Sequence, residues 1–205
     1  MKLGVLGGTF DPIHNGHIMM AEEASAYLGL DEVIFIPAGQ PRFKEGEPVT
    51  EAAHRLRMVE LAIEGKPSFR LSAMEIERGG VTYTVDTLRE LKRRLKPQDE
   101  LYFIMGWDSL QELSLWHSPS ELISLCKLAV VPRPGFPKPD LALLEEQIAG
   151  LKQRVIMLDK PVIQISSSEI REKIKNGIGI SGLVPDAVAD YIYAHDLYRE
   201  NKPSV

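Results

Sequence analysis

The chain has 205 residues, enough for one domain with a sizeable core, and 44% of them are hydrophobic and 26% charged. Its net charge of −5 argues against a protein that follows a nucleic-acid backbone, because such proteins usually carry a basic surplus. The apolar runs are too short to span a bilayer, and the first is too short for a signal-peptide core, so we expect a cytoplasmic protein with no membrane partner. The one cysteine, Cys126, lies in an apolar stretch and is expected to be a buried, inert thiol.

Short apolar runs that favour β-structure alternate along the chain with stretches of helical periodicity. The expected strands are Lys2–Leu6, Glu32–Ile36, Phe69–Leu71, Leu101–Met105, Leu128–Val131 and Val155–Leu158. The expected helices are one from near Asn15 to Leu30, then Glu51–Glu64, Thr84–Leu95, Ser120–Leu125, Ser167–Lys175 and Asp186–Ala194. The crossovers are long enough for parallel pairing, which predicts a doubly wound, mostly parallel, Rossmann-like α/β sheet with helices on both faces. We expect residues 1–205 to form a single domain, with a small helical extension over about residues 180–205.

The first expected strand runs into a glycine-rich loop, Gly7–His17. Glycines after a parallel strand let backbone N–H groups approach a phosphate closely, and a helix that begins near Asn15 points its positive end at the same place. This loop is neither the dinucleotide-binding fingerprint nor a Walker A loop. His14 and His17 flank the helix start, so both imidazoles could donate to a phosphorus that carries extra charge in a transition state.

Two other interpretations of the histidine pair remain open from the residues alone. One histidine could cap the helix while the other packs against it. Histidines at positions i and i+3 can also share a metal ion. Because no cysteine or third histidine lies nearby in the sequence, we predict no metal site built from protein side chains.

A second anion-binding loop is predicted at Ile165–Arg171, where three serines precede or begin a helix. Such serines offer hydroxyl and backbone N–H donors to an anion. Arg171 lies one turn further on the same side of the helix, where its guanidinium can form paired bonds to phosphate oxygens. A plain N-cap at Ser167 or Ser168 would also explain the serines.

These two loops together resemble the motifs of a known family. Residues 7–17, Gly-Gly-Thr-Phe-Asp-Pro-Ile-His-Asn-Gly-His, resemble the signature of the nucleotidyltransferase superfamily of α/β phosphodiesterases, and in particular that of bacterial nicotinate-nucleotide adenylyltransferases. Residues 165–171 resemble the family's Ile-Ser-Ser-Thr-x-Ile-Arg, with Ser168 in place of threonine. The resemblance implies that the catalytic residues are His14, His17, Lys44 and Arg171, and that these loops bind ATP through Gly8, Thr9, Phe10, Ser166, Ser167 and Arg171.

Two basic residues lie in further family-like segments. Residues 37–44 resemble the family's Pro-x-x-x-Pro-x-His-Lys loop, with Phe43 in place of the histidine. This implies that Lys44 meets the acceptor phosphate or the triphosphate, although the residues alone also allow a solvated loop lysine. Arg133 matches the arginine of an Arg-Pro-Gly motif, which implies that it binds the acceptor and supports a phosphate.

Three other segments concern the two nucleosides. Tyr83 and Thr84 match a Tyr-Thr helix start that faces the nicotinate carboxylate in the family, in keeping with the preference of a helix N-terminus for a negative charge. Gly106 and Asp108 match a Gly-x-Asp-x-Leu motif, which implies that Asp108 accepts hydrogen bonds from the adenosine ribose. Trp116 matches a tryptophan that stacks on the pyridine ring, while core packing is the structural alternative.

The resemblance extends from Lys2 to about Tyr198 and implies a reaction. ATP and nicotinate mononucleotide would join into deamido-NAD, with release of pyrophosphate and with Mg²⁺ arriving on ATP. A sister adenylyltransferase that uses nicotinamide mononucleotide or phosphopantetheine is the alternative enzyme. A non-catalytic nucleotide-binding module on the same fold is the alternative from another class, although the presence of both histidines and Arg171 argues against it. A homo-oligomer is left open.

Overall fold

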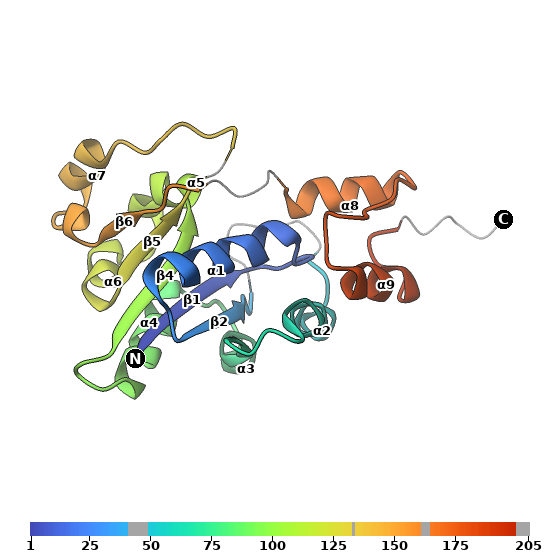
Figure 1. The fold of residues 1–205 in the computed structure, drawn as a ribbon, viewed down its shortest axis with the longest axis horizontal. Helices are drawn as coiled ribbons and strands as arrows, with labels where there is room; N and C mark the ends of the chain where they lie inside the picture. Colours follow the sequence, from blue (N-terminus) through green and yellow to red (C-terminus); the bar gives the residue numbers. More distant parts are fainter. Residues whose placement is uncertain (41–48, 133, 161–164, 200–205) are drawn as a thin grey trace.

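The structure is a computed structural model that describes residues 1–40, 49–132, 134–160 and 165–199. Within these residues, six strands form one sheet in the order β3-β2-β1-β4-β5-β6, and all five pairings are parallel (Figure 1). The strands are β1 Lys2–Gly8, β2 Glu32–Pro37, β3 Phe69–Leu71, β4 Glu100–Gly106, β5 Lys127–Val131 and β6 Val155–Met157. The predicted doubly wound α/β sheet is therefore confirmed.

The strand order places a switch in direction between β1 and β4. From β1 the chain moves outward through β2 to β3, and it then returns to the other side of β1 with β4. In an open parallel sheet, ligands bind outside the carboxyl ends of the strands at such a switch point. Both the loop after β1 and the segment after β4 lie at this place.

The helices of the described residues include three that the periodicity did not predict. They are α1 Asn15–Leu28, α2 Ala52–Ile63, α3 Met74–Arg78, α4 Thr84–Arg94, α5 Trp107–Gln111, α6 Pro119–Leu125, α7 Leu141–Gln147, α8 Ser167–Lys175 and α9 Asp186–Ala194, together with 3₁₀ turns at Leu113–Leu115 and Leu151–Gln153. The unpredicted ones, α3, α5 and α7, have five, five and seven residues. Such short helices contain at most two turns, too few for a repeating apolar stripe to stand out.

Apolar side chains cover both faces of the sheet. On one face Leu6 of β1 packs in a buried cluster with Ala21 of α1 and Met58 of α2. On the other face Val5 belongs to a cluster with Leu88 of α4. Neighbouring residues of a strand point to opposite faces, so a strand with helices on both sides is buried along most of its length.

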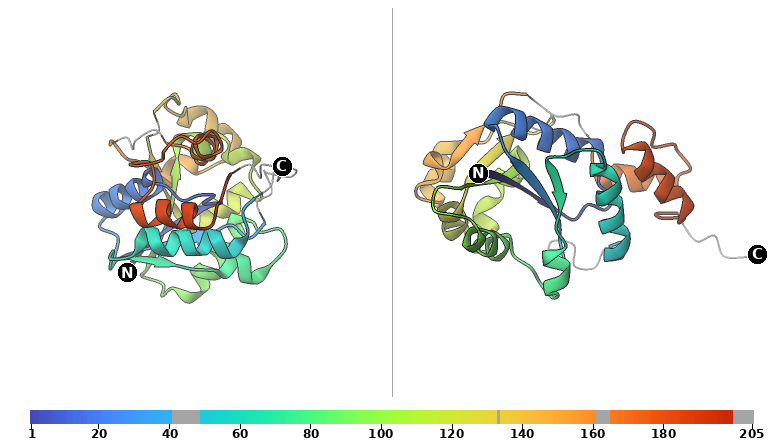
Figure 2. Two further views of the ribbon diagram at one scale, coloured as in Figure 1. Left: turned by 90° about the vertical axis from the view of Figure 1, so that its right-hand side faces the viewer. Right: turned by 60° about the horizontal axis from the view of Figure 1, so that its bottom comes forward.

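The helical C-terminal segment lies beyond the carboxyl ends of the strands, shown in orange and red in Figure 1. Helix α9 runs beside α2, as the left view of Figure 2 shows. Ile170 of α8 and Val188 and Ile192 of α9 are fully buried and belong to the same apolar cluster as α1 and α2. The C-terminal helices therefore pack against the part of the fold that carries the first signature loop.

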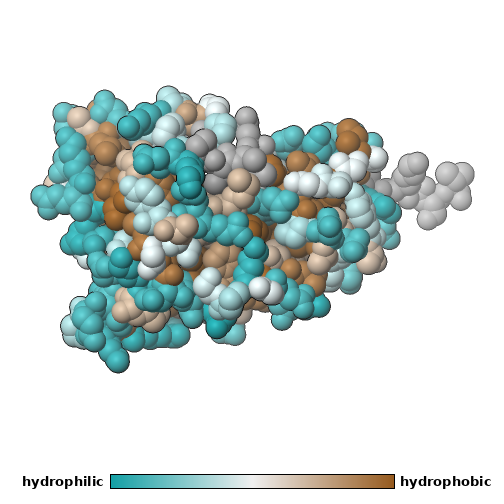
Figure 3. All heavy atoms as spheres, viewed as in Figure 1, coloured by the Kyte–Doolittle hydropathy of each residue, from teal (hydrophilic) through white to brown (hydrophobic). Residues whose placement is uncertain are grey.

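The remaining surface is mixed. On the face shown in Figure 3, hydrophobic residues are interspersed with hydrophilic ones. No helix within the described ranges has the length and apolarity needed to cross a bilayer. Cys126 is 3% exposed, and burial raises the pKa of its thiol to about 12, which confirms the prediction of a buried thiol that is poorly reactive at neutral pH.

Candidate active site

A cavity of ≈140 Å³ opens where the carboxyl ends of β1 and β4 separate. One wall comes from the loop after β1 and the start of α1, and another from the end of β4 and the segment that follows it. The cavity brings together five residues that the sequence singled out, namely His14, His17, Gly106, Asp108 and Trp116.

The two histidines lie in contact at the start of α1. His14 is the N-cap residue and is 6% exposed, and its ring stacks on that of His17 with centroids 3.7 Å apart. The backbone N–H of His14 donates to Nδ1 of His17 at 3.3 Å. Since Nδ1 accepts this bond, the proton of a neutral His17 lies on Nε2. The helix start thus offers an N–H donor on Nε2 of His17.

The loop before His14 is fixed by the packing of Phe10 and by hydrogen bonds to its main-chain carbonyls. Phe10 is 1% exposed, and its ring meets that of His17 edge-on with centroids 5.0 Å apart. Phe10 can therefore contact a nucleotide only through its backbone. The carbonyl of Gly8 accepts from Ala38 N at 2.8 Å, and the carbonyl of Thr9 accepts from Arg55 at 2.9 Å. These bonds fix the loop relative to the segment after β2.

The second predicted loop lies directly against the first. Ser167 Oγ donates to the carbonyl of Pro12 at 2.9 Å, and Arg171 Nη1 donates to the carbonyl of Asp11 at 2.8 Å. Ser166 is the N-cap of α8, because its Oγ accepts from Glu169 N at 3.1 Å, so a cap at Ser167 or Ser168 was the wrong alternative. Segments more than 150 residues apart in the sequence are thus joined beside the histidines.

Asp11 connects this loop to the last described residues. Its side chain is 1% exposed and accepts from Tyr198 Oη at 2.7 Å and from Thr50 N at 3.3 Å. Burial and the nearby Asp11 carboxylate raise the pKa of the Tyr198 hydroxyl. The signature loop is consequently bonded to α8 and to the chain beyond α9.

Gly106 and Asp108 occupy the start of the short helix α5. Gly106 is its N-cap in an extended conformation, and Asp108 lies in its first turn. A carboxylate is favourable in the first turn of a helix because it faces the positive end of the helix dipole. Both residues line the same cavity as the histidines, so a hydroxyl-bearing ligand in the cavity would meet a carboxylate acceptor.

Trp116 lines the cavity and packs edge-on against Phe103, with centroids 5.9 Å apart. Tyr83 and Thr84 are the N-cap and first residue of α4. The Tyr83 ring stacks on that of His117, the neighbour of Trp116, at 4.1 Å between centroids. The structure therefore places the Tyr-Thr helix start near the tryptophan through His117, but neither Tyr83 nor Thr84 is among the residues that line the cavity.

Two predicted site residues, Lys44 and Arg133, lie outside the described residues. Ser166, Ser167 and Arg171 surround the histidine loop without being part of the cavity lining. In the part of the chain that the structure describes, no group of three or more His, Cys, Asp or Glu side chains is arranged to hold a metal ion.

Arg55 is a central residue that the sequence did not reveal. It is 2% exposed and donates to the carbonyls of Thr9, Ala38, Gly39 and Thr50, at 2.9, 2.9, 3.3 and 3.0 Å. Desolvation of the buried guanidinium lowers its pKa, while the Asp11 carboxylate opposes this shift. Arg55 lies on the buried face of α2 with Met58 and Val59. The sequence could have indicated its burial, because Arg55 falls at the helical spacing of the apolar residues of α2.

Comparison with known proteins places the whole chain among similar enzymes. The family model described as "Cytidylyltransferase-like" matches residues 5–173. A protein of Dehalococcoides mccartyi named "Probable nicotinate-nucleotide adenylyltransferase" is 55% identical over 199 residues, which cover 97% of this chain and 98% of that protein. A protein of the same name from Thermomicrobium roseum is 44% identical, with 97% of this chain and 92% of that protein covered.

Solved structures support the fold independently. Plasmodium falciparum nicotinic acid mononucleotide adenylyltransferase complexed with NaAD superposes with a TM-score of 0.79 and 22% identity, over 96% of this chain and 97% of that one. The same enzyme complexed with APC gives a TM-score of 0.78 and 22% identity, over 96% of each chain. At this identity, the likeness establishes the shared fold.

Proposed function

Because the chain belongs to the cytidylyltransferase-like family, and within it to the nicotinate-nucleotide adenylyltransferases, we propose that it transfers the AMP unit of ATP to nicotinate mononucleotide. The products are deamido-NAD and pyrophosphate. The observation that carries the proposal is the stacked pair His14 and His17, at the sheet's switch point and bonded through its loop to Arg171 and Ser167.

The reaction needs no nucleophile from the protein. An oxygen of the acceptor's phosphate attacks the α-phosphorus of ATP in line, a new P–O bond forms, and the bond to the β-phosphate oxygen breaks. Such chemistry depends on positioning and on stabilising charge. The Nε2–H group of His17 is the donor we assign to the α-phosphate, with His14 beside it. Mg²⁺ would arrive with ATP and would supply positive charge to its phosphate groups.

The serine loop and Arg171 complete the ATP side of this proposal. Arg171 brings a positive charge to the loop of the histidines through its bond to Asp11. Ser166 and Ser167 stand at the N-terminus of α8, where backbone N–H groups suit phosphate oxygens. In the same cavity, we assign Gly106 to the approach of the adenosine and Asp108 to its ribose hydroxyls.

We assign the binding of the acceptor to Trp116 and to the nearby start of α4. The indole offers a flat face to the pyridine ring, and the start of α4 at Tyr83 and Thr84 offers backbone N–H groups to its carboxylate. We assign Lys44 and Arg133 to the phosphates on the strength of the family motifs. The proposal includes residues 1–205 as one domain in the cytoplasm, and the burial of Ile180 and Val184 in the cluster of α1 and α2 supports the single domain.

The test is an assay of the purified protein with ATP, Mg²⁺ and one candidate acceptor at a time. We expect pyrophosphate and deamido-NAD with nicotinate mononucleotide, and a kcat/KM at least about tenfold lower with nicotinamide mononucleotide, because the amide lacks the charge that the start of α4 favours. Phosphopantetheine serves as the acceptor of the alternative enzyme. Equal efficiencies for acid and amide would contradict the role of α4, and turnover with phosphopantetheine alone would overturn the proposal.

A further inference from the structure

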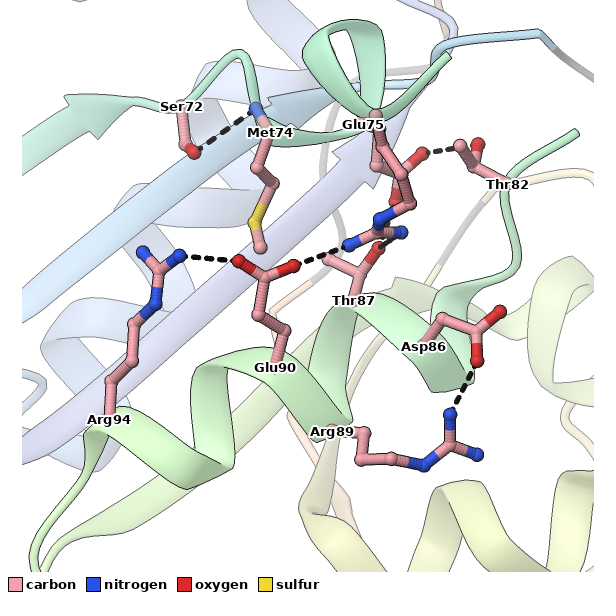
Figure 4. A network of polar contacts seen from close by, with 10 residues as sticks. Ser72, Met74, Glu75, Thr82, Asp86, Thr87, Arg89, Glu90 and Arg94 are labelled. Carbon is pink, nitrogen blue, oxygen red and sulfur yellow. Dashed lines mark hydrogen bonds and ion pairs between the residues drawn. The ribbon is translucent and has the colours of Figure 1, made fainter. Parts of the chain in front are cut away.

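A buried carboxylate lies behind the start of α4, outside all of the motifs that the sequence singled out. Glu75 is on α3 and is 9% exposed. Its Oε1 accepts from the Thr87 hydroxyl at 2.7 Å and its Oε2 accepts from the Thr82 hydroxyl at 2.9 Å (Figure 4). Burying a carboxylate costs free energy unless its oxygens are hydrogen-bonded. The two bonds from the threonines offset this cost and allow Glu75 to be buried here.

The two threonines bracket the helix start that we assign to the acceptor. Thr82 immediately precedes Tyr83, and Thr87 lies three residues after Thr84. One carboxylate therefore binds the chain before and after the first residue of α4, and it fixes the position of the start of α4 relative to α3. The backbone of the first turn is fixed in the same way. Within it Asp86 N donates to the carbonyl of Tyr83 at 3.0 Å, and the N–H groups that precede Asp86 are the ones that a helix start can offer to an anion.

A neighbouring arginine sets the direction of the hydrogen bond between Thr87 and Glu75. Arg78 donates to the Thr87 hydroxyl at 3.3 Å and to Glu90 at 2.8 Å. Arg94 pairs with Glu90 as well (Figure 4). Because the Thr87 oxygen accepts from Arg78, its own proton is directed to Glu75. The arginine thus brings a positive charge next to the buried negative one.

The segment after β2 meets α3 from the other side. A Cβ added to Gly39 would lie 2.5 Å from the carbonyl oxygen of Glu75, so the two backbones are in direct contact. Gln40 forms a β-bridge to Val81, next to Thr82. Glu75 therefore lies between the segment leading to Lys44 and the start of α4, the two places from which we expect the acceptor to be bound.

We propose that Glu75 is a positioning residue for the acceptor. Through Thr82 and Thr87 it holds the start of α4 where the N–H groups of its first turn meet the acceptor's carboxylate. The inference rests on the proposed function and adds the residue that sets acceptor affinity and the preference for acid over amide. Glu75 itself acts through the threonines and does not touch the reacting atoms.

The substitution Glu75→Gln tests this with little change of volume. A glutamine can accept from one threonine only, because its amide nitrogen is a donor, so the other hydroxyl must redirect its proton and either accept from the amide or lose its bond. Loss of a charge-assisted bond and displacement of the helix start should raise the KM for nicotinate mononucleotide by about tenfold to a hundredfold. The KM for ATP should stay within about twofold, and the preference for the acid should shrink, since the N–H groups of the first turn are no longer aligned.

A matched control comes from a second carboxylate with two short bonds. Glu145 of α7 accepts from Gly150 N and Lys152 N, both at 2.7 Å, and is not among the residues that line the cavity. Glu145→Gln should leave both KM values unchanged. Thr87→Val removes the hydroxyl that links Glu75 to α4, so it should reproduce the effect, and the double variant with Glu75→Gln should be no worse than the stronger single one.

The outcomes separate the two hypotheses. If the unmodified protein releases no pyrophosphate from ATP and nicotinate mononucleotide, the proposed function is wrong. If it is active and Glu75→Gln keeps its KM for the acceptor, or raises both KM values equally, the role of Glu75 is wrong. If Glu75→Gln fails to fold, as judged by circular dichroism, Thr87→Val and Thr82→Val provide the test. The role of Glu75 then requires that they raise the KM for the acceptor more than the KM for ATP.

Discussion

The two regions that we assign to ATP and to the acceptor are held by different kinds of contact. In the region assigned to ATP, Ser167 and Arg171 bind main-chain carbonyls of the loop after β1, and they come from the opposite end of the sequence. In the region assigned to the acceptor, Glu75 binds side-chain hydroxyls of residues only seven and twelve positions away. Contacts to a backbone survive changes of the residue that is bound, whereas contacts between side chains do not. Single substitutions should therefore alter acceptor binding more readily than the geometry at the triphosphate.

The largest effect is expected on the ATP side. His17→Ala should lower kcat by about 10²–10³, because it removes a donor aimed at the transition state. Steady-state kinetics with saturating ATP and acceptor measure this. His195→Ala, an exposed histidine after α9, is the control and should retain its kcat. A loss of less than about fivefold in a folded His17→Ala protein would remove His17 from the chemistry.

Arg55 is an exception to this difference between the two regions, because it binds the loop after β1 and also the segment after β2 that contacts α3. Arg55→Met should lower the free energy of unfolding by about 3 kcal/mol, since four buried or partly buried carbonyls lose their charged donor. It should also raise the KM for ATP and for the acceptor together. Urea unfolding of this variant is compared with that of Arg57→Met, an exposed position on the same helix, which should change stability by no more than about 0.5 kcal/mol. Equal stability of the two variants would contradict the central role of Arg55.

Trp116 sharpens the comparison on the acceptor side. Trp116→Ala should raise the KM for nicotinate mononucleotide by about tenfold, the amount expected for one lost aromatic stack, with the KM for ATP nearly unchanged. Trp116→Phe should recover most of the affinity, and Leu115→Ala, at an exposed neighbour, should have no effect. A parallel rise in both KM values would show that Trp116 supports the whole cavity by packing on Phe103.

The smallest effect concerns the bond between Tyr198 and Asp11. The pKa of Tyr198 is raised in the folded protein, so the stability it contributes is fully present below its unfolded pKa of about 10 and is lost as the pH rises above that value. Between pH 10 and 11 the unmodified protein should lose about 1 kcal/mol more than Tyr198→Phe, which has no titrating hydroxyl. Thermal unfolding over this range measures the difference. Identical slopes would mean that the hydroxyl ionises in the folded state as it does in the unfolded one.

The sheet and the meeting of the two loops were predictable from the sequence. Strand composition and crossover length predicted the parallel sheet, and the glycine-histidine and serine loops, which the sequence predicted to share an anion, are joined in the structure at Pro12 and Ser167. Family motifs pointed to Trp116 and to the start of α4. Local periodicity could not reveal α3, which is too short to show a stripe.

The residues that hold the site were harder to find than those that line it. Arg55, Glu75 and Asp11 are polar residues whose importance depends on burial, and burial is a property of the tertiary structure. From the sequence, Arg55 and Glu75 look like ordinary surface charges on helices. The only local sign was the position of Arg55 on the apolar face of α2, because the five residues of α3 present no apolar face that would single out Glu75.

The bonds from Ser167, Arg171 and Tyr198 to Pro12 and Asp11 have a consequence for the order of assembly during translation. A ribosome that has released the chain only as far as β6 has delivered every strand of the sheet. The loop that carries His14 and His17 still lacks the side chains that brace it. Nascent polypeptides of that length should thus adopt the α/β core without being able to consume ATP, and catalytic competence should arrive only with the final helices.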